Sequence, residues 1–270
     1  MTAPVHIGVV GAAGRMGQAL VRAVAAGSGV LTGALEQTGH AAVGTDAGRI
    51  AGLDDVGVAI TDAADAFFAK VDVAIEFTIP EATVRHAAAA AEAGTGMVIG
   101  TTGLDRAQME ALRRAGTRVP VVWSANMSLG VNLLSHLVET AATALGPEWD
   151  IEVMEMHHGA KRDAPSGTAL ALGQAAAAGR GVDPEASAVR GRDGDTGPRQ
   201  RGTIGYGVLR GGDVVGDHTV VFAGAGERLE LGHRAHERAI FARGAVHAAA
   251  WAARRPPGFY GMRDVLDLPT

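Results

Sequence analysis

One short segment of the chain gathers side chains suited to proton transfer and to anion binding. It runs from His157 to Thr168 and contains two adjacent histidines, Lys161 and a Pro-Ser-Gly-Thr turn. Imidazole exchanges a proton near neutral pH, and an ammonium group pairs with a carboxylate. Backbone N–H groups at the start of a helix bind anions as well. The segment therefore predicts a site that binds an anionic small molecule and protonates it.

The residues of this segment have different expected roles. Adjacent residues of a strand point to opposite sides, so only one of His157 and His158 is expected to donate the proton. Lys161 suits a carboxylate, and the N–H groups of Gly167 and Thr168 face an anion if a helix begins there. A metal site, a solvated loop and a plain helix cap are other interpretations of the same residues.

A glycine-rich loop near the start of the chain indicates a nucleotide site. Residues 11–17 read Gly-Ala-Ala-Gly-Arg-Met-Gly, between an apolar run at 5–10 and an amphipathic stretch at 16–26. Such a loop lets the backbone approach a pyrophosphate at the N-terminus of a helix. The spacing differs from the commoner Gly-x-Gly-x-x-Gly, and a tight turn without a ligand is the alternative.

An acidic residue, Glu36, follows the next expected strand, about 25 residues after the first glycine of the loop. A carboxylate at this point holds the ribose hydroxyls of the adenosine and repels a 2′-phosphate, which favours NADH. Gln37 beside it supplies no cation, whereas Arg15 in the loop can reach a phosphate, so NADPH stays open. An exposed carboxylate at a strand end is the alternative interpretation.

Strands and helices alternate through the first half of the chain. Strands are expected near 71–77, 96–100 and 120–123, with helices over 81–93 and 104–115 between them. This alternation predicts a parallel sheet with helices on both faces.

The pattern changes after about residue 126. A long helix is expected over 127–145, a strand over 149–156 and a second helix over 164–178. Residues 181–198 are polar and glycine-rich and are expected to form a mobile surface loop. The last elements are strands of an antiparallel or mixed sheet over 202–209, 212–222 and 227–233, and a helix over 239–253.

Composition limits the classes of function. The 270 residues suffice for one large or two modest domains. The net charge of −5, without a basic stripe, argues against a nucleic-acid partner. The absence of cysteine excludes disulfides, thiolate catalysis and cysteine-ligated zinc, and no metal is expected. Neither a signal-type leader nor a membrane-spanning apolar run stands out, so a cytoplasmic protein without a membrane partner is expected.

Together these motifs resemble the 4-hydroxy-tetrahydrodipicolinate reductase (dihydrodipicolinate reductase) family of bacterial lysine and diaminopimelate biosynthesis. The resemblance covers nearly the whole chain, and the segment at 157–168 is specific to this family, unlike the glycine loop. The matching motifs are Gly-Ala-Ala-Gly-Arg-Met-Gly at 11–17, Glu-Phe-Thr at 76–78, Gly-Thr-Thr-Gly at 100–103, Ala-Asn-Met-Ser-Leu-Gly-Val-Asn at 125–132, Glu-Met-His-His at 155–158, Lys-Arg-Asp-Ala-Pro-Ser-Gly-Thr-Ala at 161–169, Gly-Glu-Arg-Leu-Glu at 226–230 and Met-Arg-Asp-Val-Leu at 262–266.

With the element pattern, the resemblance implies an α/β fold. A Rossmann-like dinucleotide-binding domain with a parallel sheet is expected over 1–128. A smaller α+β domain for substrate binding and oligomerisation, with a mixed or antiparallel sheet, is expected over 129–238. Residues 239–270 are expected to return to the first domain. A homotetramer associated through the sheet of the smaller domain is also implied.

The reaction implied by the resemblance is the reduction of 4-hydroxy-tetrahydrodipicolinate, a cyclic dicarboxylate, by NADH or NADPH. His157 is then the proton donor and His158 a substrate contact. Lys161 binds one carboxylate and assists protonation, while Gly167 and Thr168 bind the other carboxylate. The implied cofactor contacts are Gly11, Ala12, Ala13, Gly14, Arg15, Met16, Glu36, Gln37, Gly100, Thr101, Thr102, Ser124, Ala125, Asn126 and Met127.

One departure from the family bears on the cofactor, and other functions remain as alternatives. Gln37 stands where some members carry arginine, which makes NADH at least as suitable as NADPH. Another NAD(P)-dependent amino-acid dehydrogenase is an alternative within the oxidoreductases. A nicotinamide-sensing regulator is an alternative from another class, although no basic helix-turn-helix pattern accompanies the glycine loop.

Overall fold

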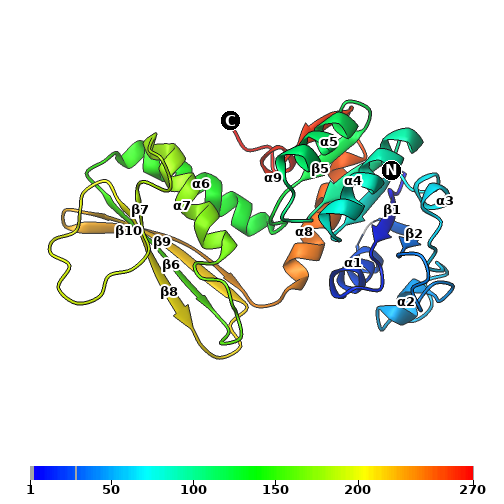
Figure 1. Cartoon of the computed structure of the whole chain (residues 1–270), viewed down its shortest axis with the longest axis horizontal. Coiled ribbons are helices and arrows are strands. Elements are labelled where there is room, and N and C mark those ends of the chain that lie inside the picture. Colours follow the sequence, from blue (N-terminus) through cyan, green and yellow to red (C-terminus); the bar gives the residue numbers. More distant parts are fainter. Residues whose placement is uncertain (1–2, 28, 270) are drawn as a thin grey trace. The chain divides into compact units, whose positions relative to one another are not determined.

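The computed structural model describes residues 3–27 and 29–269, and their contacts form two units (Figure 1). Unit 1 contains the described residues of 1–129 and 239–270, and unit 2 contains residues 130–238. Within the described ranges, no helix is both long enough and apolar enough to cross a membrane.

Unit 1 is built on a six-stranded parallel sheet with the strand order β11-β5-β4-β3-β1-β2. The inner strands are buried on both faces, which explains why their sequences are apolar apart from the buried Glu76 at the end of β3. This is the parallel α/β sheet that the sequence predicted. Its strands are β1 (His6–Val10), β2 (Val30–Leu35), β3 (Val73–Glu76), β4 (Gly96–Ile99), β5 (Pro120–Trp123) and β11 (Gly258–Tyr260).

Helices cover both faces of this sheet, and each face has its own cluster of buried apolar side chains. α1 (Arg15–Ala25) and α8 (Ala239–Ala252) pack on one face, and α3 (Ala64–Phe68), α4 (Pro80–Ala93) and α5 (Arg106–Gly116) pack on the other. α2 (Ala47–Ile50) and α9 (Met262–Val265) are short helices of the same unit. Small residues let α8 approach closely, because a Cβ on Gly244 would lie 1.8 Å from the Met127 carbonyl oxygen.

Unit 2 contains a five-stranded sheet in the order β10-β9-β6-β8-β7. β6 runs antiparallel to β9 and parallel to β8, so the sheet is mixed, which is one of the two forms expected. Its strands are β6 (Asp150–His157), β7 (Ala188–Val189), β8 (Ile204–Arg210), β9 (Gly216–Gly224) and β10 (Glu227–Ala235). Its helices are α6 (Leu129–Leu145) and α7 (Gly167–Arg180).

One face of this sheet is covered by α6 and α7, which share a buried cluster with it (Figure 1). Side chains of β6 alternate between the two faces, as the sequence of this strand predicted. Ile151, Val153, Glu155 and His157 are buried on the helix-covered face. We call the opposite face, which carries Met154, Met156, Leu209 and Val221, the open face.

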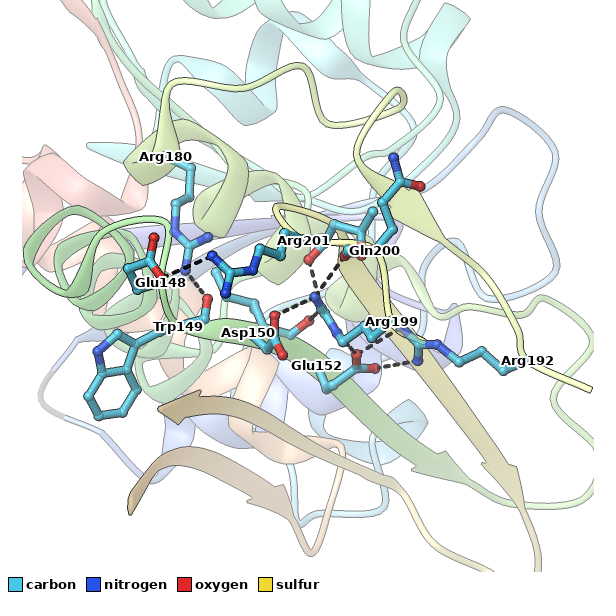
Figure 2. Close-up of polar contacts among 11 residues, drawn as sticks. Glu148, Trp149, Asp150, Glu152, Arg180, Arg192, Arg199, Gln200 and Arg201 are labelled. Carbon is cyan, nitrogen blue, oxygen red and sulfur yellow. Dashed lines mark hydrogen bonds and ion pairs between the residues drawn. The ribbon is translucent and has the colours of Figure 1, made fainter. Parts of the chain in front are cut away.

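The segment after α7 is anchored to the sheet rather than forming only the mobile surface loop that its composition predicted (Figure 2). It contains β7, and two of its arginines reach β6. Arg192 donates to Glu152 at 3.0 and 3.1 Å. Arg199 donates to Asp150 at 2.7 Å and to Glu152 at 2.9 Å. The sequence showed these charges, but only the fold places them opposite the carboxylates of β6.

Candidate functional site

His157 is the last residue of β6 and lies on its helix-covered face. The residue two positions earlier on the same face is Glu155, whose Oε2 lies 2.6 Å from Nδ1 of His157. Both side chains are nearly enclosed. Two-residue alternation along a strand produces this pair, so the predicted strand already contained the signal for Glu155 as the partner of His157.

Glu155 is an ionised carboxylate inside the unit. Burial by itself would raise its pKa, but hydrogen bonds from Arg210, His157 and the Ser166 backbone outweigh burial and lower the pKa below its usual value. Arg210 binds both carboxylate oxygens, at 2.8 and 2.9 Å, and the Ser166 N–H donates at 3.0 Å. Sequence reasoning missed Arg210, because only the β6–β8 register places it beside His157.

The charge of Glu155 determines which nitrogen of His157 can exchange a proton. An ionised carboxylate only accepts hydrogen bonds, so Nδ1 of His157 carries a hydrogen. Among the described residues no hydrogen-bond partner faces Nε2. A Cβ on Gly216 would lie 2.9 Å from Nε2, so the glycine leaves room at this edge of the ring. Nε2 is therefore the nitrogen available for proton transfer.

A second buried histidine, His218 on β9, packs against His157. The two rings meet edge to face, with centroids 5.1 Å apart. Burial, followed by the neighbouring His157, lowers the pKa of His218 to about 4, so this ring is neutral at physiological pH. Its Nε2 lies 3.0 Å from the Ser166 hydroxyl. No motif in the sequence pointed to His218.

Ser166 forms the N-cap of α7, and its hydroxyl accepts from the Ala169 N–H at 3.1 Å. The helix therefore begins at Gly167, three residues later than its predicted start at 164. Gly167 is exposed and Thr168 partly buried in the first turn, where backbone N–H groups point out of the helix end. This end of α7 is thus a place where an anion can bind.

Lys161 and His158 lie on the turn that follows β6. The Lys161 ammonium is 2.9 Å from Asp163 and lowers the pKa of that carboxyl. Its charge also contributes, as the smallest of several causes, to the low pKa of His218. His158 is partly exposed, and its backbone N–H donates to the Val214 carbonyl at 2.8 Å.

A cleft of about 560 Å³ lies at the carboxyl ends of β1, β2 and β3 in unit 1. Five of the predicted cofactor residues line it, namely Gly11, Ala13, Gly14, Glu36 and Gln37. The other predicted cofactor residues are not among those lining this cleft. Sequence reasoning missed several further residues that line it, namely Thr38, His40, Asp62, Thr78, Arg85 and His86.

The glycine loop is shaped for close backbone approach. Gly11 has a φ of +71°, which favours glycine. A Cβ on Gly17 would lie 2.0 Å from the Gly11 carbonyl oxygen, so α1 can meet the loop only with glycine there. Glu36 reaches across to the loop and accepts from the Ala13 N–H at 3.1 Å and from the Gln37 N–H at 3.0 Å. The Glu36 carboxylate is thus hydrogen-bonded to the glycine loop.

The predicted cofactor residues after β4 and β5 include some with mainly structural contacts. The Thr101 hydroxyl is buried and bonds to the Thr78 N–H at 3.1 Å and the Thr83 hydroxyl at 2.9 Å. Ser124 donates to the Asn126 carbonyl at 2.8 Å. Ala12 and Met127 are core side chains, each 1% exposed. Only backbone groups of these buried residues can serve a ligand.

Comparison with known proteins connects both units to one family. The family model described as dihydrodipicolinate reductase, N-terminus, matches residues 5–127, and the one described as dihydrodipicolinate reductase, C-terminus, matches residues 130–266. The 4-hydroxy-tetrahydrodipicolinate reductase of Brucella abortus (strain 2308) is 54% identical over 97% of this chain and 98% of its own length. That of Cereibacter sphaeroides (strain ATCC 17023) is 55% identical over 96% of this chain and 97% of its own length.

Solved structures share the fold. A dipicolinate-bound dihydrodipicolinate reductase from Paenisporosarcina sp. TG-14 superposes with a TM-score of 0.79 at 22% identity, covering 97% of this chain and 99% of its own. An amine dehydrogenase from Mycobacterium smegmatis gives a TM-score of 0.61 at 14% identity, covering 99% of this chain and 97% of its own.

Proposed function

This chain belongs to the dihydrodipicolinate reductase family, and we propose that it reduces 4-hydroxy-tetrahydrodipicolinate to tetrahydrodipicolinate with a nicotinamide cofactor. Two relatives that carry this activity in their names are 54% and 55% identical to it over nearly its whole length. Within the chain, the observation that carries the proposal is the His157–Glu155 pair, 2.6 Å apart.

The glycine loop fits a dinucleotide. Its positive φ at Gly11 and the space that a Cβ on Gly17 would fill bring backbone N–H groups to the end of α1. Gly11, Ala13 and Gly14 would hold the pyrophosphate, and Glu36 would hold the ribose hydroxyls. The 4-hydroxyl of the substrate leaves as water, with a proton from the adjacent ring carbon. When bound, the nicotinamide would supply a hydride to the unsaturated ring that results, and a proton delivered to carbon completes the reduction.

Unit 2 binds the dicarboxylate and supplies the proton. Lys161 pairs with one carboxylate, and the first-turn N–H groups at Gly167 and Thr168 receive the other. His158 is a further substrate contact. His157 donates its Nε2 proton to the substrate carbon, while Glu155 keeps the Nδ1–H in place. Two fixed charges on the substrate thus orient it against a fixed proton donor.

NADH serves this chain at least as well as NADPH. Glu36 lines the cleft with its carboxylate already directed to the loop, and a 2′-phosphate beside it would be repelled. Gln37 adds no positive charge to offset that repulsion. Arg85 and His40 line the same cleft and offer donors to a phosphate, so NADPH remains a usable cofactor.

We further propose that the chain assembles as a homotetramer through the open face of unit 2. This face presents apolar side chains, with Met154 44% and Leu209 59% exposed. Contiguous exposed apolar side chains on a sheet commonly mark a protein interface. The family resemblance implies association through the sheet of this unit, which supports the proposal.

The reaction is tested with substrate generated enzymatically, following NADH and NADPH oxidation in parallel. We expect oxidation of both cofactors, with kcat/KM for NADH equal to or above that for NADPH. His157→Gln should lower kcat by about 100-fold or more, the usual contribution of a general acid, with cofactor affinity unchanged. The matched control His6→Gln, at an exposed residue of β1, should behave like the parent. Absence of oxidation with either cofactor would contradict the proposal.

A further inference from the structure

Ser166 lies between the proposed proton donor and the proposed anion site. Its backbone N–H donates to Glu155 Oε1 at 3.0 Å, and its hydroxyl lies 3.0 Å from Nε2 of His218. The same hydroxyl caps α7 by accepting from the Ala169 N–H at 3.1 Å. The residue is 2% exposed. Ser166 thus contacts Glu155, His218 and the first turn of α7.

We propose that Glu155 and Ser166 are positioning residues that couple the proton-donating edge of His157 to the anion-binding end of α7. The inference rests on the proposed role of His157. Glu155 acts through Nδ1 of His157, and Ser166 acts through Glu155 and through the first turn of the helix. Neither residue needs to touch the substrate.

The contacts on the imidazole restrict it to one orientation. Glu155 holds Nδ1, the His218 ring packs edge to face against it, and Gly216 borders the Nε2 edge. Arg210 in turn holds Glu155 through both carboxylate oxygens. A ring fixed in this way presents one nitrogen in one direction, which proton transfer to carbon requires.

Glu155 favours the return of a proton to His157 after each turnover. When the substrate carbon is protonated, the Nε2–H bond of His157 breaks and a C–H bond forms, leaving a neutral ring. Nδ1–H stays on His157, bound to the carboxylate, and water returns a proton to Nε2. The negative charge of Glu155 stabilises the imidazolium form that must be restored between turnovers.

Coupling to the helix follows from the adjacency of Ser166 and Gly167. An anion at the first turn of α7 fixes the position of the residue next to it, and that residue holds Glu155 through its N–H. Substrate binding and proton-donor geometry therefore depend on one shared segment. Changes at Glu155 and Ser166 should not act independently.

The test compares Glu155→Gln, Ser166→Ala and the double variant in the full chain, measuring kcat, KM and their pH dependence. Glu155→Gln should lower kcat about tenfold or more and move the alkaline limb of kcat/KM to lower pH, because a neutral amide stabilises an imidazolium less. Ser166→Ala keeps the backbone N–H to Glu155 but removes the hydroxyl that caps α7, which loosens the first turn of the helix. It should therefore raise KM for the dicarboxylate and lower kcat. The double variant should lose less than the product of the two single losses.

The matched control is Glu152→Gln, the same substitution on the other face of β6, where Glu152 contacts Arg192 and Arg199 (Figure 2). Glu152 is ion-paired with Arg192 and Arg199, so this variant also breaks partly exposed charge contacts, on the face of β6 opposite His157. It should keep the parent's kcat and pH profile. The titratable groups that surround His157 are Glu155, Arg210, Lys161 and the neutral His218, with Asp163 and His233 beyond them.

Two results would overturn the inference. One is an unmoved alkaline limb in Glu155→Gln, and the other is fully multiplicative losses in the double variant. If Glu155→Gln does not fold, as judged by its near-UV spectrum, the kinetics of Ser166→Ala decide alone, and a parent-like KM and kcat there are the contradicting result. A failure of the proposed function is distinguishable, since His157→Gln would then retain turnover.

Discussion

The two buried histidines of unit 2 differ because of one carboxylate. His157 has Glu155 at Nδ1, whereas His218 faces the Ser166 hydroxyl and has a buried Nδ1 with no partner among the described residues. A carboxylate supports a charged ring and a hydroxyl does not. The same residue type is therefore the proposed proton donor at position 157 and neutral packing at position 218.

Stability should fall in acid because of His218. Its pKa is about 4 in the folded chain against 6.5 as the ordinary value, so the unfolded chain binds more protons between these limits. Folding stability is then complete above the ordinary value and decreases as pH falls toward the folded one, by up to about 3 kcal/mol. Calorimetry of the parent and His218→Gln at several pH values checks this. The parent's Tm should fall more steeply below about pH 6.5, and parallel curves would refute the assignment.

At the scale of elements, the two faces of β6 carry side chains with different partners. Its helix-covered face ends in Glu155 and His157, while its other face carries Asp150 and Glu152, which anchor the segment after α7. The strand is central in the sheet, between β9 and β8. Alternation along one strand therefore separates the proposed site from the ion pairs that fasten the surface segment.

The junction of β1 and α1 should tolerate no side chain at Gly17. An added Cβ would lie 2.0 Å from the Gly11 carbonyl oxygen, so the loop or the helix must move. We expect Gly17→Ala to lower the free energy of unfolding by about 1–3 kcal/mol and to weaken NADH binding. Titration of NADH and thermal unfolding measure both effects. Gly191→Ala, with nothing within 4 Å of its added Cβ, is the control. Parent-like NADH affinity in Gly17→Ala would contradict this account of the loop.

For the whole molecule, the open face is where assembly should be sensitive to charge. Light scattering after gel filtration should give the parent about four times the 27.4 kDa of one chain. Leu209→Lys places a charge among the apolar side chains of this face and should give a smaller species. Val30→Lys, at another exposed aliphatic residue in unit 1, should leave the mass unchanged. A parent of single-chain mass, or an unchanged Leu209→Lys assembly, would contradict the proposed interface.

Local patterns in the sequence were enough to predict the strands and helices of the chain and its candidate functional motifs. Alternating strands and helices predicted the parallel sheet of unit 1, because both-face burial makes its inner strands apolar apart from Glu76. The glycine loop and Glu36 could be found without a structure, since their spacing follows from one βαβ unit. The adjacent His157 and His158 likewise stood out by type alone.

Tertiary structure decided which groups surround the proposed proton donor. Arg210 reaches Glu155 only through the β6–β8 register, and His218 reaches His157 only through β9. Arg85, on α4 and far along the chain from the glycine loop, lines the same cleft as that loop. Sequence periodicity reports which face a side chain takes, but not which strand lies beside it. The partners that set the tautomer of His157 therefore became visible only when the strands were paired.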